Sequence, residues 1–224
     1  MTSADEAKQR ILAANAAAAR ALRERCERSG TLVVNLISSP GSGKTALLEA
    51  SARRLAGRWR MAAVVGDIAT ERDAERLRAA GLPARQIVTG GACHLDARML
   101  AEALEQAAFP ELDLLFVENV GNLVCPASFD LGESFKVVLL SVTEGADKPL
   151  KYPGIFSKAE VALITKLDLA PHLAFDIEAA RAEIRSLRPD GTLLGLSSKT
   201  GEGMEEWCEL LGERVEARRA ALAR

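Results

Sequence analysis

Aromatic residues, histidine and cysteine are all scarce in this sequence. Aromatics make up 4% of the 224 residues, and there are two histidines and four cysteines. Two histidines exclude a histidine-rich metal store. No uninterrupted apolar run approaches the roughly 20 residues that span a bilayer. The first 30 residues contain acids and repeated arginines instead of an apolar core followed by a cleavage site. We therefore predict no secretory signal, a cytoplasmic location and reduced thiols.

The formal net charge of −2 gives no indication of bulk electrostatic binding to nucleic acid or to a membrane surface, and we expect neither partner. Hydrophobic residues are 48% of the chain, which is enough to bury a full core, and charged residues are 27%. The length suits one α/β domain of ordinary size.

Short apolar runs alternate with helix-forming segments along most of the chain. Strands are predicted at about 31–37, 61–65, 86–89, 112–117, 136–142, 161–165 and 192–196, and helices at about 3–29, 46–55, 70–80, 95–108, 174–187 and 203–221. This alternation predicts an α/β fold with a mostly parallel sheet flanked by helices on both faces. We divide the chain into an N-terminal helical extension, residues 1–30, and a main domain, residues 31–224.

Residues 38–45, Ser-Ser-Pro-Gly-Ser-Gly-Lys-Thr, follow a predicted strand and open a predicted helix, which is the context of a phosphate-binding loop. Backbone N–H groups of such a turn and the helix N-terminus attract phosphate oxygens. Lys44 can reach the β- and γ-phosphates, and the Thr45 hydroxyl can bind Mg²⁺. Ser38 stands where the usual pattern has glycine. The nucleotide-binding residues predicted in this loop are Gly41, Ser42, Gly43, Lys44 and Thr45.

Two acidic residues follow apolar strands and are candidates for the magnesium side of the site. Asp67 follows 62–66, and Glu118 follows 114–117. A carboxylate in this position can hold Mg²⁺ or its waters near the γ-phosphate. We predict Lys44, Asp67 and Glu118 as catalytic residues, and Thr45, Asp67 and Glu118 as Mg²⁺ ligands. Asp67 and Asp73 are two candidates for positioning the attacking water.

Two segments indicate that the base is guanine. Thr165-Lys166-Leu167-Asp168 is similar to the Asn-Lys-x-Asp motif, with Thr165 in the place of asparagine. The Asp168 carboxylate could accept from guanine N1–H and from the 2-amino group, a pair of donors that adenine lacks, so the site would reject ATP. The segment 197–201, Ser-Ser-Lys-Thr-Gly, follows the last predicted strand. In this it is similar to the Ser-Ala-Lys loop of GTPases, in which a backbone N–H faces guanine O6. The base-site residues predicted here are Thr165, Lys166, Asp168, Ser197, Ser198 and Lys199. Together with the phosphate loop, they predict that residues 31–224 form a GTPase domain of the P-loop NTPase fold.

A cysteine–histidine pair, Cys93 and His94, lies at a predicted strand-to-helix turn. Cys125 lies four residues after Gly121 of the segment Glu118-x-x-Gly121, which stands in the place of the Asp-x-x-Gly of many GTPases. Thiolate and imidazole suit Zn²⁺ and Ni²⁺. The residues alone leave two interpretations open, a metal site or a buried cysteine beside a surface histidine.

The segments 38–45, 90–96, 118–126 and 148–153 together resemble the HypB family of hydrogenase nickel-incorporation GTPases, and the resemblance covers about residues 30–215. It implies GTP hydrolysis during nickel delivery to the large subunit of [NiFe]-hydrogenase, and a nucleotide-dependent homodimer. It also implies a metal site for Ni²⁺ or Zn²⁺ built from Cys93, His94 and Cys125. The first 30 residues lack the cysteine-rich or histidine-rich nickel motif of some members, so another nickel chaperone would supply the metal.

Three hypotheses follow for function. The first is a GTP-hydrolysing nickel metallochaperone, for which the expected cofactors are GTP/GDP, Mg²⁺, and Ni²⁺ or Zn²⁺ or both. The second is a P-loop ATP enzyme or kinase, against which Asp168 argues. The third is a scaffold that dimerises with GTP and delivers no metal, which multiple-turnover hydrolysis would distinguish from the first.

Overall fold

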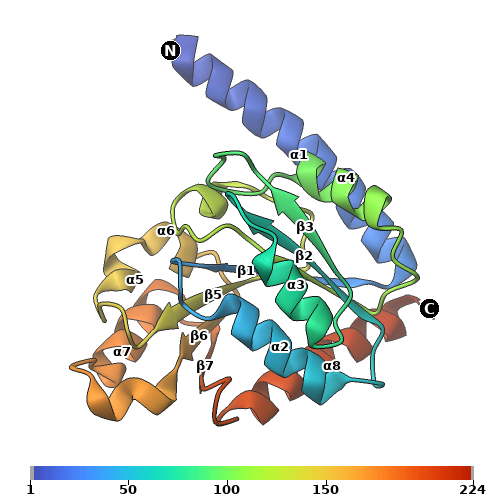
Figure 1. The fold of residues 1–224 in the computed structure, drawn as a ribbon. Helices are drawn as coiled ribbons and strands as arrows, with labels where there is room; N and C mark the ends of the chain where they lie inside the picture. The colour runs from blue at the N-terminus through green and yellow to red at the C-terminus, as the bar shows by residue number, and fades with distance from the viewer. Residues whose placement is uncertain (1–2, 223–224) are drawn as a thin grey trace.

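The computed structural model describes residues 3–222, and a seven-stranded sheet lies at its centre (Figure 1). The strand order is β3-β2-β4-β1-β5-β6-β7, and every neighbouring pair is parallel. The strands are β1 Leu32–Ser38, β2 Met61–Asp67, β3 Ala84–Val88, β4 Leu114–Glu118, β5 Phe135–Ser141, β6 Val161–Thr165 and β7 Thr192–Leu196.

Helices connect these strands and cover the sheet. They are α1 Ser3–Ser29, α2 Lys44–Leu55, α3 Arg72–Ala79, α4 Ala97–Ala107, α5 Lys148–Lys151, α6 Pro153–Phe156, α7 Ile177–Leu187 and α8 Met204–Leu222, with 3₁₀ turns η1 Cys125–Ser128 and η2 Leu167–His172. Within residues 3–222, no helix combines the length and the apolar character that crossing a membrane requires.

The two faces of the sheet have separate cores. One core joins the sheet to α2, α3 and α8, and its largest side chain is Trp207, which donates to the Ser51 hydroxyl at 2.9 Å. On the opposite face, α1 and α4 cover one half of the sheet while α6 and α7 cover the other half. Strands β1 and β4 are buried along their whole length because helices lie on both faces. The carboxyl ends of β1 and β4, where the phosphate loop and Glu118 lie, are therefore held by packing on both faces of the sheet.

The parallel arrangement and the order of elements confirm the predicted fold class. Differences lie at boundaries and in short elements. Helix α4 begins at Ala97 rather than 95, because Asp96 caps it by accepting from the backbone N–H of Met99 at 2.8 Å. Helices α5 and α6 were not predicted, since Pro149 and Pro153 interrupt any helical pattern long enough to recognise.

The C-terminal half of α1 lies along α4, whereas its N-terminal end projects beyond the sheet (Figure 1). Ala19, Leu22 and Cys26 bury one face of α1 in the core that it shares with α4. The division into an extension, 1–30, and a domain, 31–224, stays a prediction.

Candidate functional site

The phosphate loop joins the end of β1 to the start of α2. Gly41 and Gly43 have φ angles of +74° and +98°, in the left-handed region that glycine enters without steric cost. Gly43 immediately precedes Lys44, the first residue of α2, so the helix N-terminus opens toward the turn. This geometry provides converging backbone N–H groups and a favourable dipole for phosphate.

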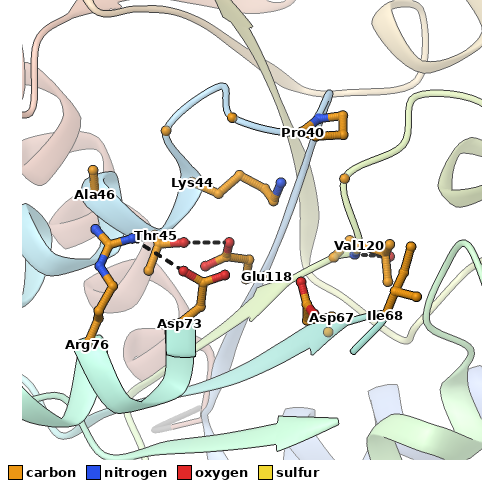
Figure 2. A pocket seen from close by; sticks show the side chains of 15 residues that line it. Pro40, Lys44, Thr45, Ala46, Asp67, Ile68, Asp73, Arg76, Glu118 and Val120 are labelled. Atoms are coloured by element: carbon orange, nitrogen blue, oxygen red, sulfur yellow. Dashed lines mark hydrogen bonds and ion pairs between the residues drawn. The ribbon is translucent and has the colours of Figure 1, made fainter. Parts of the chain in front are cut away.

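Lys44, Thr45 and Glu118 meet beneath this turn. Lys44 is buried and donates to the Ser38 hydroxyl at 3.0 Å. Thr45 donates to Glu118 Oε1 at 2.8 Å (Figure 2). Burial lowers the pKa of Lys44 despite the nearby carboxylates. Burial also raises the pKa of Glu118 to about 7, although Lys44 and the Thr45 hydroxyl favour the carboxylate.

The second oxygen of Glu118, Oε2, is buried and has no hydrogen-bond partner among the described residues. An unpaired buried carboxylate oxygen beside a threonine hydroxyl suits a hard cation or one of its waters. The residues present therefore fit Mg²⁺ at the position that the sequence predicts.

A cavity of about 390 Å³ lies between the phosphate loop, β2 and the start of the loop after β4. Figure 2 shows the side chains of Asp67, Asp73 and Arg76 around it, opposite Lys44. Partial burial acts to raise the pKa of Asp67, but the backbone N–H groups of Ala69 and Thr70 donate to its carboxylate and lower the pKa overall. Asp67 thus faces the cavity as an anion.

Arg76 was not predicted as a site residue. Its guanidinium lies 3.3 Å from Asp73 and is held by Glu49 at 3.0 and 3.1 Å. Arg76 lies on α3, 32 residues after Lys44 and 31 residues after Thr45, and it belongs to no recognisable motif. Arg76 therefore adds a second positively charged side chain to the cavity lining, besides Lys44, on the side away from the phosphate loop.

The predicted base-site residues converge on a second cavity of about 310 Å³, lined in part by Lys166, Asp168, Ser198 and Lys199. The Ser197 hydroxyl donates to Asp168 Oδ1 at 2.6 Å and fixes the orientation of that carboxylate. Ser197 itself is fully buried.

Thr165 and Lys166 tie the base site to the phosphate loop. The Thr165 hydroxyl donates to the Ser42 carbonyl at 2.8 Å, and the Lys166 ammonium donates to the Gly41 carbonyl at 2.7 Å. Lys166 has a φ of +60°, which is uncommon for a residue with a side chain. Thr165 can therefore tether the phosphate loop although it stands in the place of asparagine.

Glu144 and Lys148 form a further contact with the phosphate loop. Sequence reasoning missed Glu144, whereas it considered Lys148 as a residue that contacts the nucleotide or a partner subunit. The Ser42 hydroxyl donates to Glu144 Oε1 at 2.6 Å, and the Lys148 ammonium lies 2.9 Å from Glu144 Oε2. The same ammonium donates to the Ser39 hydroxyl at 2.8 Å. Burial opposes the charge of Glu144, but hydrogen bonds led by Ser42 and Lys148 outweigh it and lower the pKa.

Cys93, His94 and Cys125 lie together, with their candidate ligand atoms all within 4.8 Å of one another. The two Sγ atoms are 2.9 Å apart, and Cys93 Sγ lies 3.7 Å from His94 Nδ1. The hydrogen bond with Cys125, together with burial, raises the pKa of the Cys93 thiol, and burial lowers the pKa of His94. The His94 ring packs on Phe129 with a centroid distance of 3.8 Å. Three soft or borderline ligands thus face one point.

The loop after β4 contacts both the phosphate loop and the cysteine cluster. Gly121 packs so closely on Pro40 that a Cβ at Gly121 would lie 2.9 Å from Pro40 Cα. One residue later, the Asn122 amide donates to the Cys93 carbonyl at 3.1 Å. Asn119, also in this loop, accepts from the backbone N–H of Leu95 at 3.1 Å. A movement of this loop would therefore reach the cluster through direct contacts.

The fold, the phosphate loop and the adjoining carboxylates define a P-loop nucleotide-binding protein. The model of the family described as "CobW/HypB/UreG, nucleotide-binding domain" matches residues 32–194. The chain is 51% identical over 218 residues to the hydrogenase maturation factor HypB of Azotobacter vinelandii, covering 96% of this chain and 72% of that protein. It is 52% identical over 180 residues to HypB of Escherichia coli K12, covering 80% of this chain and 62% of that protein.

Among solved structures, HypB from Helicobacter pylori in complex with nickel superposes with a TM-score of 0.85 at 40% identity, covering 91% of this chain and 95% of that chain. The chain belongs to the HypB family. Membership in this P-loop family supports nucleotide hydrolysis as the general activity.

Proposed function

We propose that this protein is a GTP-hydrolysing metallochaperone that binds nickel and assists its GTP-dependent insertion into the large subunit of [NiFe]-hydrogenase. The observation that carries the proposal is the cluster of Cys93, His94 and Cys125 and its connection to the phosphate loop. Gly121 packs on Pro40 of that loop, and the next residue, Asn122, donates to the Cys93 carbonyl. The relatives are hydrogenase maturation factors, and one solved relative was crystallised in complex with nickel.

The oriented carboxylate of Asp168 supports guanine as the base. With Ser197 donating to one oxygen, the carboxylate is turned toward the cavity where two adjacent guanine donors would reach it. A site that hydrogen-bonds a substrate group rejects an analogue that lacks the group, which disfavours ATP.

Lys44 would contact the β- and γ-phosphates while Thr45, Glu118 and Asp67 hold the metal side. Magnesium, when bound, neutralises charge that develops on the phosphoryl oxygens. Lys44 would exchange the Ser38 hydroxyl for phosphate oxygens, and backbone N–H groups from Gly41 to Lys44 would orient the chain of phosphates. Asp67 or Asp73 would orient the attacking water, since both line the cavity beyond Lys44.

Nickel is the cargo in this proposal, and zinc would compete for the same thiolates and imidazole. The γ-phosphate would act on Gly121, whose backbone packs on the phosphate loop, and the neighbouring Asn122 would pass the displacement to Cys93. Because Cys125 lies four residues beyond Gly121, the same loop carries the third ligand. Loss of the γ-phosphate would then change the separation of the two thiols and weaken the hold on the metal.

The proposal includes protein partners and a location. A second copy would join in a nucleotide-dependent homodimer, another nickel chaperone would supply the metal, and the hydrogenase large subunit would receive it. Nickel delivery would take place in the cytoplasm.

The decisive experiment measures Ni²⁺ and Zn²⁺ affinity in the presence of GDP and of a non-hydrolysable GTP analogue, with the oligomeric state followed in the same samples. Cys93→Ala removes one thiol of the cluster, and Cys208→Ala removes a buried thiol of α8 as the matched control. We expect affinity to depend on the nucleotide in the wild type and in Cys208→Ala, and the dependence to vanish in Cys93→Ala. Metal binding that ignores both nucleotide and Cys93 would refute the delivery mechanism and favour the scaffold hypothesis.

A further inference from the structure

Asn15 is a buried polar residue on the otherwise apolar face of α1. It is 6% exposed, and Ala19, Leu22 and Cys26 follow it at helical spacing on the same buried face. An amide in such a position is costly unless its donor and acceptor are both paired. Its partners therefore show why an asparagine is accommodated there.

The two ends of the Asn15 amide bind two different loops. Oδ1 accepts from the backbone N–H of Ala97 at 2.9 Å, and Nδ2 donates to the carbonyl of Asp130 at 2.8 Å. Ala97 is the first residue of α4, and an N–H at that position has no partner within its own helix. Asn15 supplies that partner from α1.

Each of these loops carries part of the cysteine cluster. His94 lies three residues before Ala97, and Cys125 lies five residues before Asp130. Phe129, the neighbour of Asp130, packs on the His94 ring at 3.8 Å. The two segments that must approach one another to form the cluster are thus bridged by one amide.

Arg23, two turns further along α1, reinforces one end of this bridge. Its guanidinium donates to both carboxylate oxygens of Asp130, at 2.6 and 2.7 Å. Partial burial acts to raise the pKa of Asp130, but the hydrogen bonds from Arg23 and from the backbone N–H of Gly132, together with the nearby positive charges, lower the pKa overall. Helix α1 therefore holds the loop after η1 through two side chains, and holds the start of α4 through one of them.

We propose that Asn15 is a positioning residue for the Cys93, His94 and Cys125 cluster, through which α1 sets the separation of the two ligand-bearing loops. This inference rests on the proposed metal-binding role of that cluster. It gives a function within the site to α1, the helix whose N-terminal end projects beyond the sheet (Figure 1).

The test uses three variants of the full chain. Asn15→Ala removes both hydrogen bonds. Asn15→Asp keeps an acceptor for the Ala97 N–H but removes the donor to the Asp130 carbonyl. Leu22→Ala is the matched control, because it loosens the packing of the same buried face without removing a hydrogen bond to either loop.

Two readouts separate positioning from general destabilisation. The first is Ni²⁺ affinity from the thiolate-to-nickel charge-transfer absorption, measured beside GDP affinity. The second is capture of phenylarsine oxide, which bridges two neighbouring thiols with release of water and needs no nickel. Outer contacts that orient metal ligands change affinity by roughly 10–100-fold, so we expect about a tenfold loss of Ni²⁺ affinity in Asn15→Ala.

Asn15→Ala should also capture the arsenical more weakly than the wild type. Asn15→Asp should have a capture affinity between those of Asn15→Ala and the wild type. GDP affinity should be unchanged in both variants. The inference is overturned if both Asn15 variants capture the arsenical like the wild type, or if Leu22→Ala, at an equal loss of Tm, weakens capture as much as they do. Should the wild type bind no nickel while arsenical capture still depends on Asn15, the proposed function fails and the positioning role stands.

Discussion

Replacing Thr165 by valine tests whether a threonine can tether the phosphate loop where the familiar motif has asparagine. Thr165 is 3% exposed, and its hydroxyl donates to the Ser42 carbonyl at 2.8 Å. Valine keeps the shape but leaves that carbonyl without its donor. A buried polar group that loses its partner costs about 1–3 kcal/mol, so we expect the nucleotide-free protein to lose about 2 kcal/mol of stability.

The same change should weaken nucleotide binding, because a loop that is no longer held spends part of its time outside the phosphate-binding conformation. We expect GDP and GTP affinity to fall about tenfold, which corresponds to about 1.4 kcal/mol. Fluorescence titration with a labelled guanine nucleotide and urea denaturation would measure the two effects.

Thr192→Val is the matched control, because Thr192 opens β7 and its hydroxyl makes no hydrogen bond among the described residues. It should change neither quantity appreciably. If Thr165→Val lowers stability but leaves GDP affinity untouched, the hydrogen bond is only structural and the reasoning about the tether is wrong.

Three other changes give separate predictions. Asp168→Asn should lower GTP affinity by 100-fold or more while leaving xanthine nucleotide binding less affected, as competition titrations would show; equal losses for both would contradict the assignment of the base site. Glu144→Gln should weaken GDP binding about tenfold, since charge-assisted hydrogen bonds contribute about 1.5–3 kcal/mol each, and calorimetric titration would measure it; an unchanged affinity would exclude Glu144 as a support of the phosphate loop. Asp113→Asn should lower Tm at pH 7, because hydrogen bonds from Arg60 and Arg219 outweigh burial and hold the pKa of Asp113 well below its usual value. A lowered folded-state pKa stabilises the protein above the unfolded value of 3.8 and loses that effect as pH falls, so the difference in Tm should shrink below about pH 4; a constant difference would contradict the ion-pair explanation.

Local sequence was sufficient for the order and type of the main elements. Strands β1 and β4 are apolar throughout because both faces are covered, and their runs of apolar residues are recognisable without tertiary information. The phosphate loop is also local, since glycine conformation, the helix start and the lysine all lie within eight residues. Short elements such as α5 and η1 escaped prediction, because four residues carry too little periodicity to recognise.

What the sequence by itself determined is therefore the alternating α/β pattern, the phosphate loop, and the residue types that a guanine or nickel site would need. Tertiary structure alone decided the contacts that no motif predicts: the Thr165 hydroxyl with the Ser42 carbonyl, and the Asn15 amide with backbone groups of both ligand-bearing loops. It also brings Cys93 to 2.9 Å from Cys125, a pair that only the family resemblance assigned to one site. The physical reason is that hydrophobic periodicity records which face of an element is buried, whereas a hydrogen bond across 115 positions, from Asn15 to Asp130, depends on how the covered elements pack.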